Sequence, residues 1–137
     1  MGSKKEELFE EGCVLLHIKE KLPEANLTAE ELEQLASMFL EKEIPWPALE
    51  IYNFLGRPEN LKALLQKYIM HYLENGSPRF AREVCEEIKG EMPSKEVLRK
   101  LGEDYLRKRW CGAAMEILSM TGVEHGEMQR LLKLYGC

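Results

Sequence analysis

The sequence predicts an all-α fold, a superhelix of about three helical hairpins with a capping helix at each end. First, apolar residues recur at a fixed step of 33 residues without a gap, and a period in this range is typical of stacked repeats. Second, the apolar residues within each period are spaced three and one positions apart, as on one face of a helix. Third, turn-forming residues divide each period into two parts, which makes each repeat a hairpin.

Most of the corresponding positions in the three periods are apolar. In the first helix they are Leu32, Leu35, Ala36, Phe39 and Leu40, then Leu65, Tyr68, Ile69, Tyr72 and Leu73, then Leu98, Leu101, Gly102, Tyr105 and Leu106. In the second helix Ala48, Glu50, Ile51 and Leu55 correspond to Ala81, Glu83, Val84 and Ile88, and to Ala114, Glu116, Ile117 and Thr121. A hairpin cannot bury a single apolar stripe alone, so we expect neighbours to stack and caps to cover the outermost hairpins.

Capping and turn residues place the individual helices. Thr28 is followed three residues later by Glu31, as in a capping box, and Ser94 is a second expected N-cap. Glycines follow the second helix of each hairpin, where a helix commonly ends. We expect helices at roughly 4–21, 29–43, 47–55, 59–74, 78–89, 95–108, 111–121 and 124–135. The predicted organisation is an N-terminal capping helix within 1–28, three repeats at 29–61, 62–94 and 95–122, and a C-terminal capping helix within 123–137.

Length and composition fit one folded domain. The chain has 137 residues, of which 45% are apolar, and this is enough for a core. Its longest apolar stretches, such as Cys13–Leu16, are far shorter than the roughly 20 residues that span a bilayer. The segment Met1–Lys5 lacks the apolar core of a signal peptide, so we expect a cytoplasmic protein that does not enter a membrane.

Four cysteines, Cys13, Cys85, Cys111 and Cys137, show neither the close pairing of a zinc site nor the density of a disulfide scaffold. We therefore expect all four to be reduced. Cys85 and Cys111 are expected to pack as small apolar side chains on helical faces. Cys137 is expected to be exposed and open to oxidation between molecules.

The repeats resemble the tetratricopeptide repeats, whose pattern has a large apolar residue at the eleventh position and alanine at the twentieth. Counted from Ala29, Lys62 and Lys95, the eleventh position is Phe39, Tyr72 and Tyr105, and the twentieth is Ala48, Ala81 and Ala114. The small eighth position is Ala36 and Gly102 but Ile69 in the middle repeat, and the period is one residue shorter than the family's. The resemblance covers about 29–122 and implies a right-handed α-α superhelix whose first helices line a concave groove. Pentatricopeptide repeats, which also have two helices per unit, stay open as relatives.

The groove is the candidate partner-binding site. In this register the residues that face it are Glu33, Ser37, Glu41, Gln66, Met70, Glu74, Arg99, Glu103 and Arg107. The helix at 29–43 has five glutamates and one lysine, whereas 95–109 has six basic and three acidic residues. Such a groove would orient a partner segment with the reverse charge pattern. The alternative is that these charges are ordinary solvated helix surface.

A stack of helical repeats favours binding over catalysis. We expect a non-catalytic protein–protein interaction module that binds a peptide or helix of a partner protein in the concave groove. The alternative is RNA binding, suggested by the likeness to pentatricopeptide repeats and by the basic run Arg107–Arg109 beside Trp110. The net charge of −5 disfavours nucleic acid, and Trp46 and Trp110 are expected to pack the hairpin turns instead. The three histidines lack metal-ligand spacing, so we expect no enzyme, no cofactor and no metal.

Overall fold

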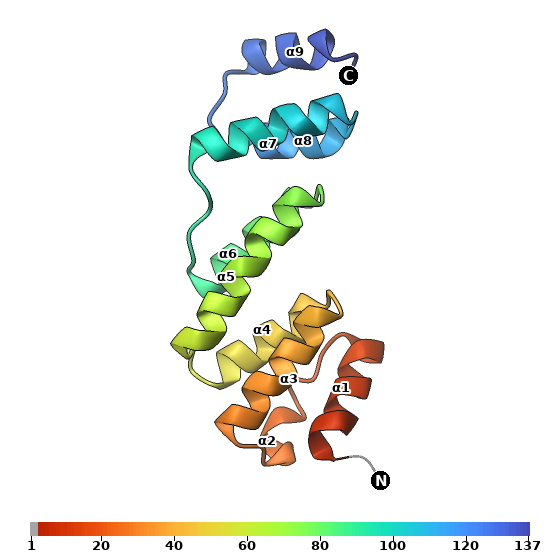
Figure 1. The fold of residues 1–137 in the computed structure, drawn as a ribbon, viewed down its shortest axis with the longest axis vertical. Helices are drawn as coiled ribbons and strands as arrows, with labels where there is room; N and C mark the ends of the chain where they lie inside the picture. The colour runs from red at the N-terminus through yellow and green to blue at the C-terminus, as the bar shows by residue number, and fades with distance from the viewer. Residues whose placement is uncertain (1–2) are drawn as a thin grey trace. The chain divides into compact units, whose positions relative to one another are not determined.

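The computed structural model describes residues 3–137 and folds them into helices joined by turns and loops (Figure 1). The helices are α1 (Lys4–Leu15), α2 (Leu22–Ala25), α3 (Ala29–Glu41), α4 (Pro45–Phe54), α5 (Glu59–Glu74), α6 (Pro78–Ile88), α7 (Lys95–Arg107), α8 (Cys111–Ser119) and α9 (His125–Leu134). No strand occurs over residues 3–137, so the predicted all-α class is confirmed. Within the same range, no helix is both long enough and apolar enough to cross a membrane.

The prediction of one continuous helix at 4–21 is wrong. Helix α1 ends at Leu15 because Leu16 adopts a left-handed backbone conformation with φ 58°, and its N–H donates to the carbonyl of Gly12 at 2.8 Å. Helical structure resumes only at α2, which has Pro23 in its first turn. The N-terminal cap is therefore a helix followed by a short helical turn.

The chain divides into two compact units. Unit 1 contains the residues through Gln66 together with Glu87–Gly90, and unit 2 contains Lys67–Glu86 together with Glu91–Cys137. This division passes through α5 and α6 rather than between hairpins. The repeat boundaries and the superhelical arrangement of the hairpins stay predictions.

In unit 1 the core lies where α3 packs against α1 and α4 (Figure 1). Leu35, Ala36 and Phe39 of α3 are fully buried, and so is Ile51 of α4. Gly12 of α1 faces the Phe39 ring so closely that an added Cβ atom would overlap the ring. Glycine at this position therefore lets the N-terminal cap approach α3.

The starts of α3 and α7 follow the predicted capping patterns. Thr28 Oγ1 accepts the N–H of Glu31 at 3.1 Å, and the Glu31 carboxylate accepts the N–H of Thr28 at 3.3 Å. This reciprocal pair is the predicted capping box. Ser94 likewise accepts the N–H of Val97 at 3.3 Å. Both N-cap predictions are confirmed.

In unit 2 the core lies between α7 and α8, with α9 packed beside α8 (Figure 1). Tyr105 of α7 and Ile117 of α8 are buried, and the Tyr105 hydroxyl donates to the carbonyl oxygen of Leu73. A Cβ atom on Gly102 would lie 2.7 Å from a methyl group of Leu118. Glycine at this position of α7 therefore lets the Leu118 side chain of α8 pack closely.

Replacing Phe39 by alanine should lower the free energy of unfolding by about 3 to 5 kcal/mol, because it truncates a fully buried aromatic side chain. Its ring centroid lies 5.2 Å from that of Phe9, so the loss also loosens α1. Urea denaturation followed by circular dichroism measures the change. Val14→Ala is the control, because that side chain is 81% exposed and should change stability by less than about 0.5 kcal/mol. A loss below about 1 kcal/mol for Phe39→Ala would contradict a packed core at this position.

Burial raises the pKa of the Tyr105 phenol from 10.0 to about 12. The native state therefore keeps this proton more tightly than the unfolded chain does, so its contribution to stability is complete below pH 10 and is lost as the pH rises through 12. Tyr105→Phe should remove that part of the alkaline destabilisation. An absorbance titration of tyrosinate measures the phenol directly, and ionisation of native Tyr105 near pH 10 would contradict this interpretation.

Candidate interaction surfaces

The groove residues predicted in unit 1 are partly engaged with neighbouring side chains. Glu33 of α3 accepts a hydrogen bond from the Asn60 side chain of α5 at 2.5 Å, and the Ser37 hydroxyl donates to the Glu33 carbonyl at 3.2 Å. Glu41 is exposed, and Gln66 packs against Gly90. A polar hollow of about 270 Å³ lies here, lined by Glu30, Glu33, Gln34, Ser37, Asn60, Leu61 and Leu64.

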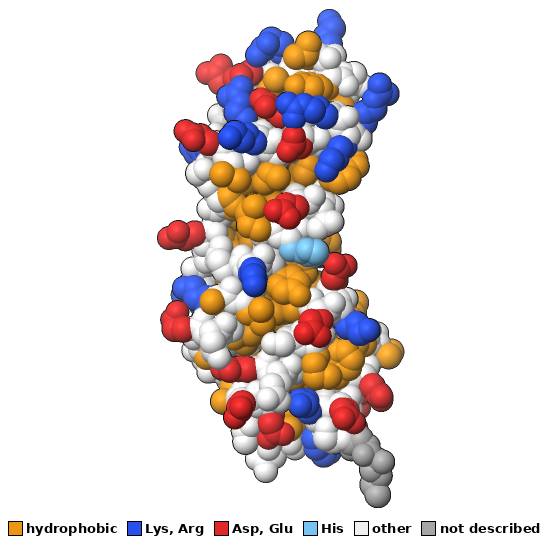
Figure 2. All heavy atoms as spheres, viewed as in Figure 1, with side chains coloured by type: hydrophobic (Ala, Val, Ile, Leu, Met, Phe, Trp, Pro, Cys, Tyr) orange, Lys and Arg blue, Asp and Glu red, His pale blue; other side chains and the backbone are white. Residues whose placement is uncertain are grey.

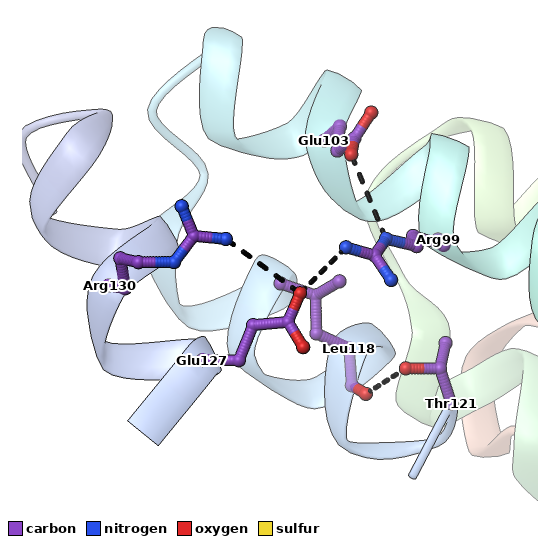
Figure 3. Close-up of polar contacts among 6 residues, drawn as sticks. All are labelled: Arg99, Glu103, Leu118, Thr121, Glu127 and Arg130. Carbon is purple, nitrogen blue, oxygen red and sulfur yellow. Dashed lines mark hydrogen bonds and ion pairs between the residues drawn. The ribbon is translucent and has the colours of Figure 1, made fainter. Parts of the chain in front are cut away.

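The groove residues predicted in unit 2 include two arginines that are held in ion pairs. Arg99 of α7 donates to the Glu127 carboxylate of α9 at 2.8 Å and lies 3.9 Å from the carboxylate of Glu103 (Figure 3). Arg130 lies 3.9 Å from the same Glu127 oxygen, so this carboxylate bridges two cations (Figure 3). Arg107 pairs with Asp104 at 2.6 Å. Arg99 therefore ties the C-terminal cap to α7.

The other two predicted residues of unit 2 lie on α5, where Met70 is half-buried and Glu74 is exposed. Over α7 and α9, Figure 2 shows basic and acidic side chains interspersed on the face in view. Such alternation agrees with solvated helix surface, the alternative raised by the sequence. A groove formed by all nine residues stays a prediction.

The outer face of α4 forms a larger and more apolar hollow in unit 1. It is lined by Lys19, Leu22, Pro23, Trp46, Leu49, Glu50, Asn53, Phe54 and Glu87 and encloses about 470 Å³. Five of these residues recur along α4 at the spacing of one helical face, the face opposite the buried Ala48 and Ile51. Trp46 and Phe54 are 36% and 47% exposed. A helix that is apolar on both faces is normally buried on both, but this one leaves its outer face open.

Other hairpins of the chain lack this aromatic face. One period further along, the positions of Trp46, Leu49 and Phe54 are occupied by Arg79, Arg82 and Glu87 on α6 and by Gly112, Met115 and Met120 after that. On α6, Arg82 lies 3.9 Å from Glu86 in an exposed ion pair. The hairpin therefore does not require aromatic residues at these positions.

Two carboxylates lie at the rim of the α4 hollow. The Glu50 carboxylate accepts the N–H of Ile18 at 2.6 Å and so holds the loop between α1 and α2 against α4. Glu87 accepts a long hydrogen bond of 3.5 Å from the Asn53 side chain. Lys19 is the cation among the lining residues, so carboxylates outnumber cations around the apolar floor.

The sequence did not indicate this hollow. Trp46 was expected to pack a hairpin turn, and only the inner stripe of α4 was expected to be apolar. The missed signal was a second apolar stripe on a ten-residue helix, with Trp46, Leu49 and Phe54 on its outer side. By contrast, Trp110 packs as expected, because its ring covers Gly76 and lies 5.5 Å from the Tyr105 ring.

The expectation of four reduced cysteines is wrong for two of them. Cys111, the first residue of α8, and Cys137 are joined by a disulfide with their Cα atoms 5.8 Å apart. Sequence spacing alone could not reveal this pair, because the two cysteines are 26 positions apart and the return of α9 brings them together. Cys13 and Cys85 are free thiols, and burial raises the pKa of the Cys85 thiol.

Over residues 3–137, no three His, Cys, Asp or Glu side chains are placed to hold a metal ion. Comparison with family models, curated proteins and solved structures gave no match to this chain. The assignment of function therefore depends on the surfaces described above.

The ion pair between Arg99 and Glu127 should contribute about 0.5 kcal/mol to stability, since both side chains are partly exposed to solvent. A double-mutant cycle with Arg99→Gln and Glu127→Gln, measured by urea denaturation, gives this coupling energy. The same cycle between Arg107 and Glu127 is the control, because Arg107 pairs with Asp104 instead. Equal coupling in both cycles would contradict a specific link between α7 and α9.

Proposed function

We propose that this chain is a non-catalytic interaction module that binds a peptide or helix of a partner protein, with the outer face of α4 as a contact surface. The open apolar face of this helix is the observation that carries the proposal. An exposed Trp and Phe beside a concave floor are the kind of anchor that protein interfaces use, since large aromatic side chains dominate binding energy there.

The size and composition of the hollow favour a short segment as its occupant. At about 470 Å³ it lies within the range of binding pockets, and it accommodates a few side chains rather than a whole domain. Leu22 and Leu49 form a buried floor, while Trp46 and Phe54 stand at the two ends of α4. An apolar side chain on one face of a partner helix would bury these groups from water.

Charge at the rim indicates what should flank that apolar side chain. Glu50 and Glu87 lie beside the apolar floor, so a lysine or arginine next to the anchor residue would find a carboxylate partner. A flanking acidic residue would be repelled by the same carboxylates. The expected partner is therefore an amphipathic segment with a large apolar anchor and adjacent basic residues.

The predicted concave groove is kept as a second contact surface in this proposal. Arg107 is its clearest test, because its side chain is mostly exposed and its ion pair with Asp104 lies within one helix. Arg99 is a poor test, since changing it also loosens α9. Loss of partner binding in Arg107→Glu would support the groove.

RNA binding is the alternative function, and it would depend on Trp110 as a stacking surface for a base. The ammonium group of Lys108 lies 4.7 Å from the centre of the Trp110 ring and covers one face of it. The ring also packs against Tyr105 and Gly76, although the residue is still 39% exposed. Stacking on a base would require these contacts to open.

Changing the outer face of α4 to the residues found one period later should weaken partner binding at least about tenfold, which corresponds to about 1.4 kcal/mol. The variant is Trp46→Arg with Phe54→Glu, and its helicity and melting are measured beside binding because Trp46 is only 36% exposed. Phe54→Glu alone, at a side chain that is 47% exposed, replaces the double variant if that one is destabilised. Phe80→Glu is the matched control, because Phe80 is 46% exposed on α6 and does not line the hollow.

The experiment is affinity capture from a cell lysate with the wild type and both variants, followed by mass spectrometry, nucleic-acid sequencing and a dissociation constant for the purified partner. A protein held by the wild type and by Phe80→Glu but lost by the double variant supports the proposal. Unchanged binding in the double variant would move the site away from α4. Recovery of RNA without protein would favour the alternative function.

A further inference from the structure

The disulfide between Cys111 and Cys137 holds the far end of α9 against α8. At its other end, α9 is joined to α8 by the short connection of residues 120–124. Between these two attachments only Leu131 and Leu132 of the helix are buried, and Leu134 is 69% exposed. The Arg99 to Glu127 ion pair adds a partly exposed contact. The disulfide is therefore a large part of what keeps α9 in place.

A hollow of about 730 Å³ opens beside Cys137. It is lined by Gly126, Gln129, Arg130, Leu132, Lys133, Gly136 and Cys137. Cys137 is exposed and lines this hollow, whereas Cys111 is half-buried. Arg130 and Lys133 are both exposed and line this hollow, whereas Glu127, which pairs with Arg130, is not among the lining residues. The approach to Cys137 is thus favourable for an anion.

Cys111 is placed to leave as a thiolate. It is the first residue of α8, and the N-cap residue Trp110 makes no side-chain hydrogen bond to the helix. The N–H groups of the first turn and the positive end of the helix dipole therefore face this position. Lys108 and Arg109 precede it in the chain and add positive charge. Such surroundings stabilise a cysteine thiolate.

We propose that the Cys111–Cys137 disulfide is a reversible redox site that reacts with small carboxylate-bearing thiols and that its reduction releases α9 from α8. The remaining thiols do not compete for this role within the described residues, since Cys85 is buried and Cys13 is distant in sequence and half-buried. In a disulfide scaffold all cysteines are paired, whereas this chain has two free thiols and one disulfide. The Cys111–Cys137 pair is therefore not part of such a scaffold.

The reaction consists of two thiol–disulfide exchanges. A thiolate attacks the sulfur of Cys137 and forms a mixed disulfide, while the bond to Cys111 breaks and its electron pair stays on the Cys111 sulfur. A second thiolate attacks the bound thiol's sulfur, so a small-molecule disulfide departs and Cys137 is released as a thiolate. Two thiols are oxidised, the cysteine pair gains two electrons, and two protons from water complete the free thiols.

The test measures how fast the folded protein is reduced by two probes of different charge. Reduced glutathione carries carboxylates, whereas cysteamine carries an ammonium group. Alkylation and intact mass report the free thiols over time, and the same protein unfolded in urea gives the reference rate for each probe. The ratio of the reduction rate with glutathione to the rate with cysteamine is compared between folded and unfolded protein. We expect this ratio to be at least about threefold higher for the folded protein, because steering by nearby charge raises association rates.

Charge reversal at the hollow supplies the matched variants. Arg130→Glu with Lys133→Glu should abolish the preference for glutathione, while Lys100→Glu, which changes an exposed lysine on α7, should leave it intact. If the double variant fails to fold, the dependence of the wild-type rate ratio on salt concentration gives the same information. A rate ratio equal to the urea reference and unaffected by salt would overturn the assignment of the thiol class.

Hydrogen exchange measures the consequence for α9. Reduction, or the substitution Cys137→Ser, should raise the exchange rates of α9 amides at least about tenfold, with α3 and α4 of unit 1 as the internal reference. Unchanged exchange in α9 would overturn its release. Recovery of both cysteines as free thiols from protein kept under oxidising conditions would overturn the site itself.

Discussion

Within each unit, the burial of one helix's apolar stripe by its neighbours explains most of what the structure shows. In unit 1 the stripe of α3 is covered on one side by α4 and on another by α1, with Phe39 at the centre and Gly12 giving the ring its space. In unit 2 the stripe of α7 is covered by α8, and Gly102 gives Leu118 its space. At both contacts an added Cβ atom would force the neighbouring side chain to move.

Helix α4 is an exception, since it has a second apolar face that nothing in unit 1 fully covers. Its inner residues Ala48 and Ile51 are fully buried, yet Trp46 and Phe54 remain partly exposed on the outside. The corresponding residues on α6 are charged, so folding of a hairpin does not explain the aromatic pair. The proposed contact with another protein would explain it, and the acidic rim from Glu50 and Glu87 indicates the charge that such a partner should carry.

The parts of the structure that were predictable from the sequence are those set by local or periodic physics. Helical class follows from the spacing of apolar residues, and the starts at Thr28 and Ser94 follow from capping by side chains three residues away. The break at Leu16 was missed because a left-handed leucine has no sequence signal comparable to glycine. The disulfide and the α4 hollow were missed because both depend on chain segments brought together only by folding.

The central claim is that the outer face of α4 meets a partner, and site-specific photo-cross-linking tests it most directly. A photoreactive side chain would be placed at Phe54 and, in a second protein, at Phe80, two positions of similar exposure on α4 and α6. The structure predicts that a partner protein is cross-linked from position 54 and not from position 80, with the cross-linked peptide containing an apolar residue beside a lysine or arginine. Equal cross-linking from both positions, or cross-linking from position 80 alone, would contradict the claim.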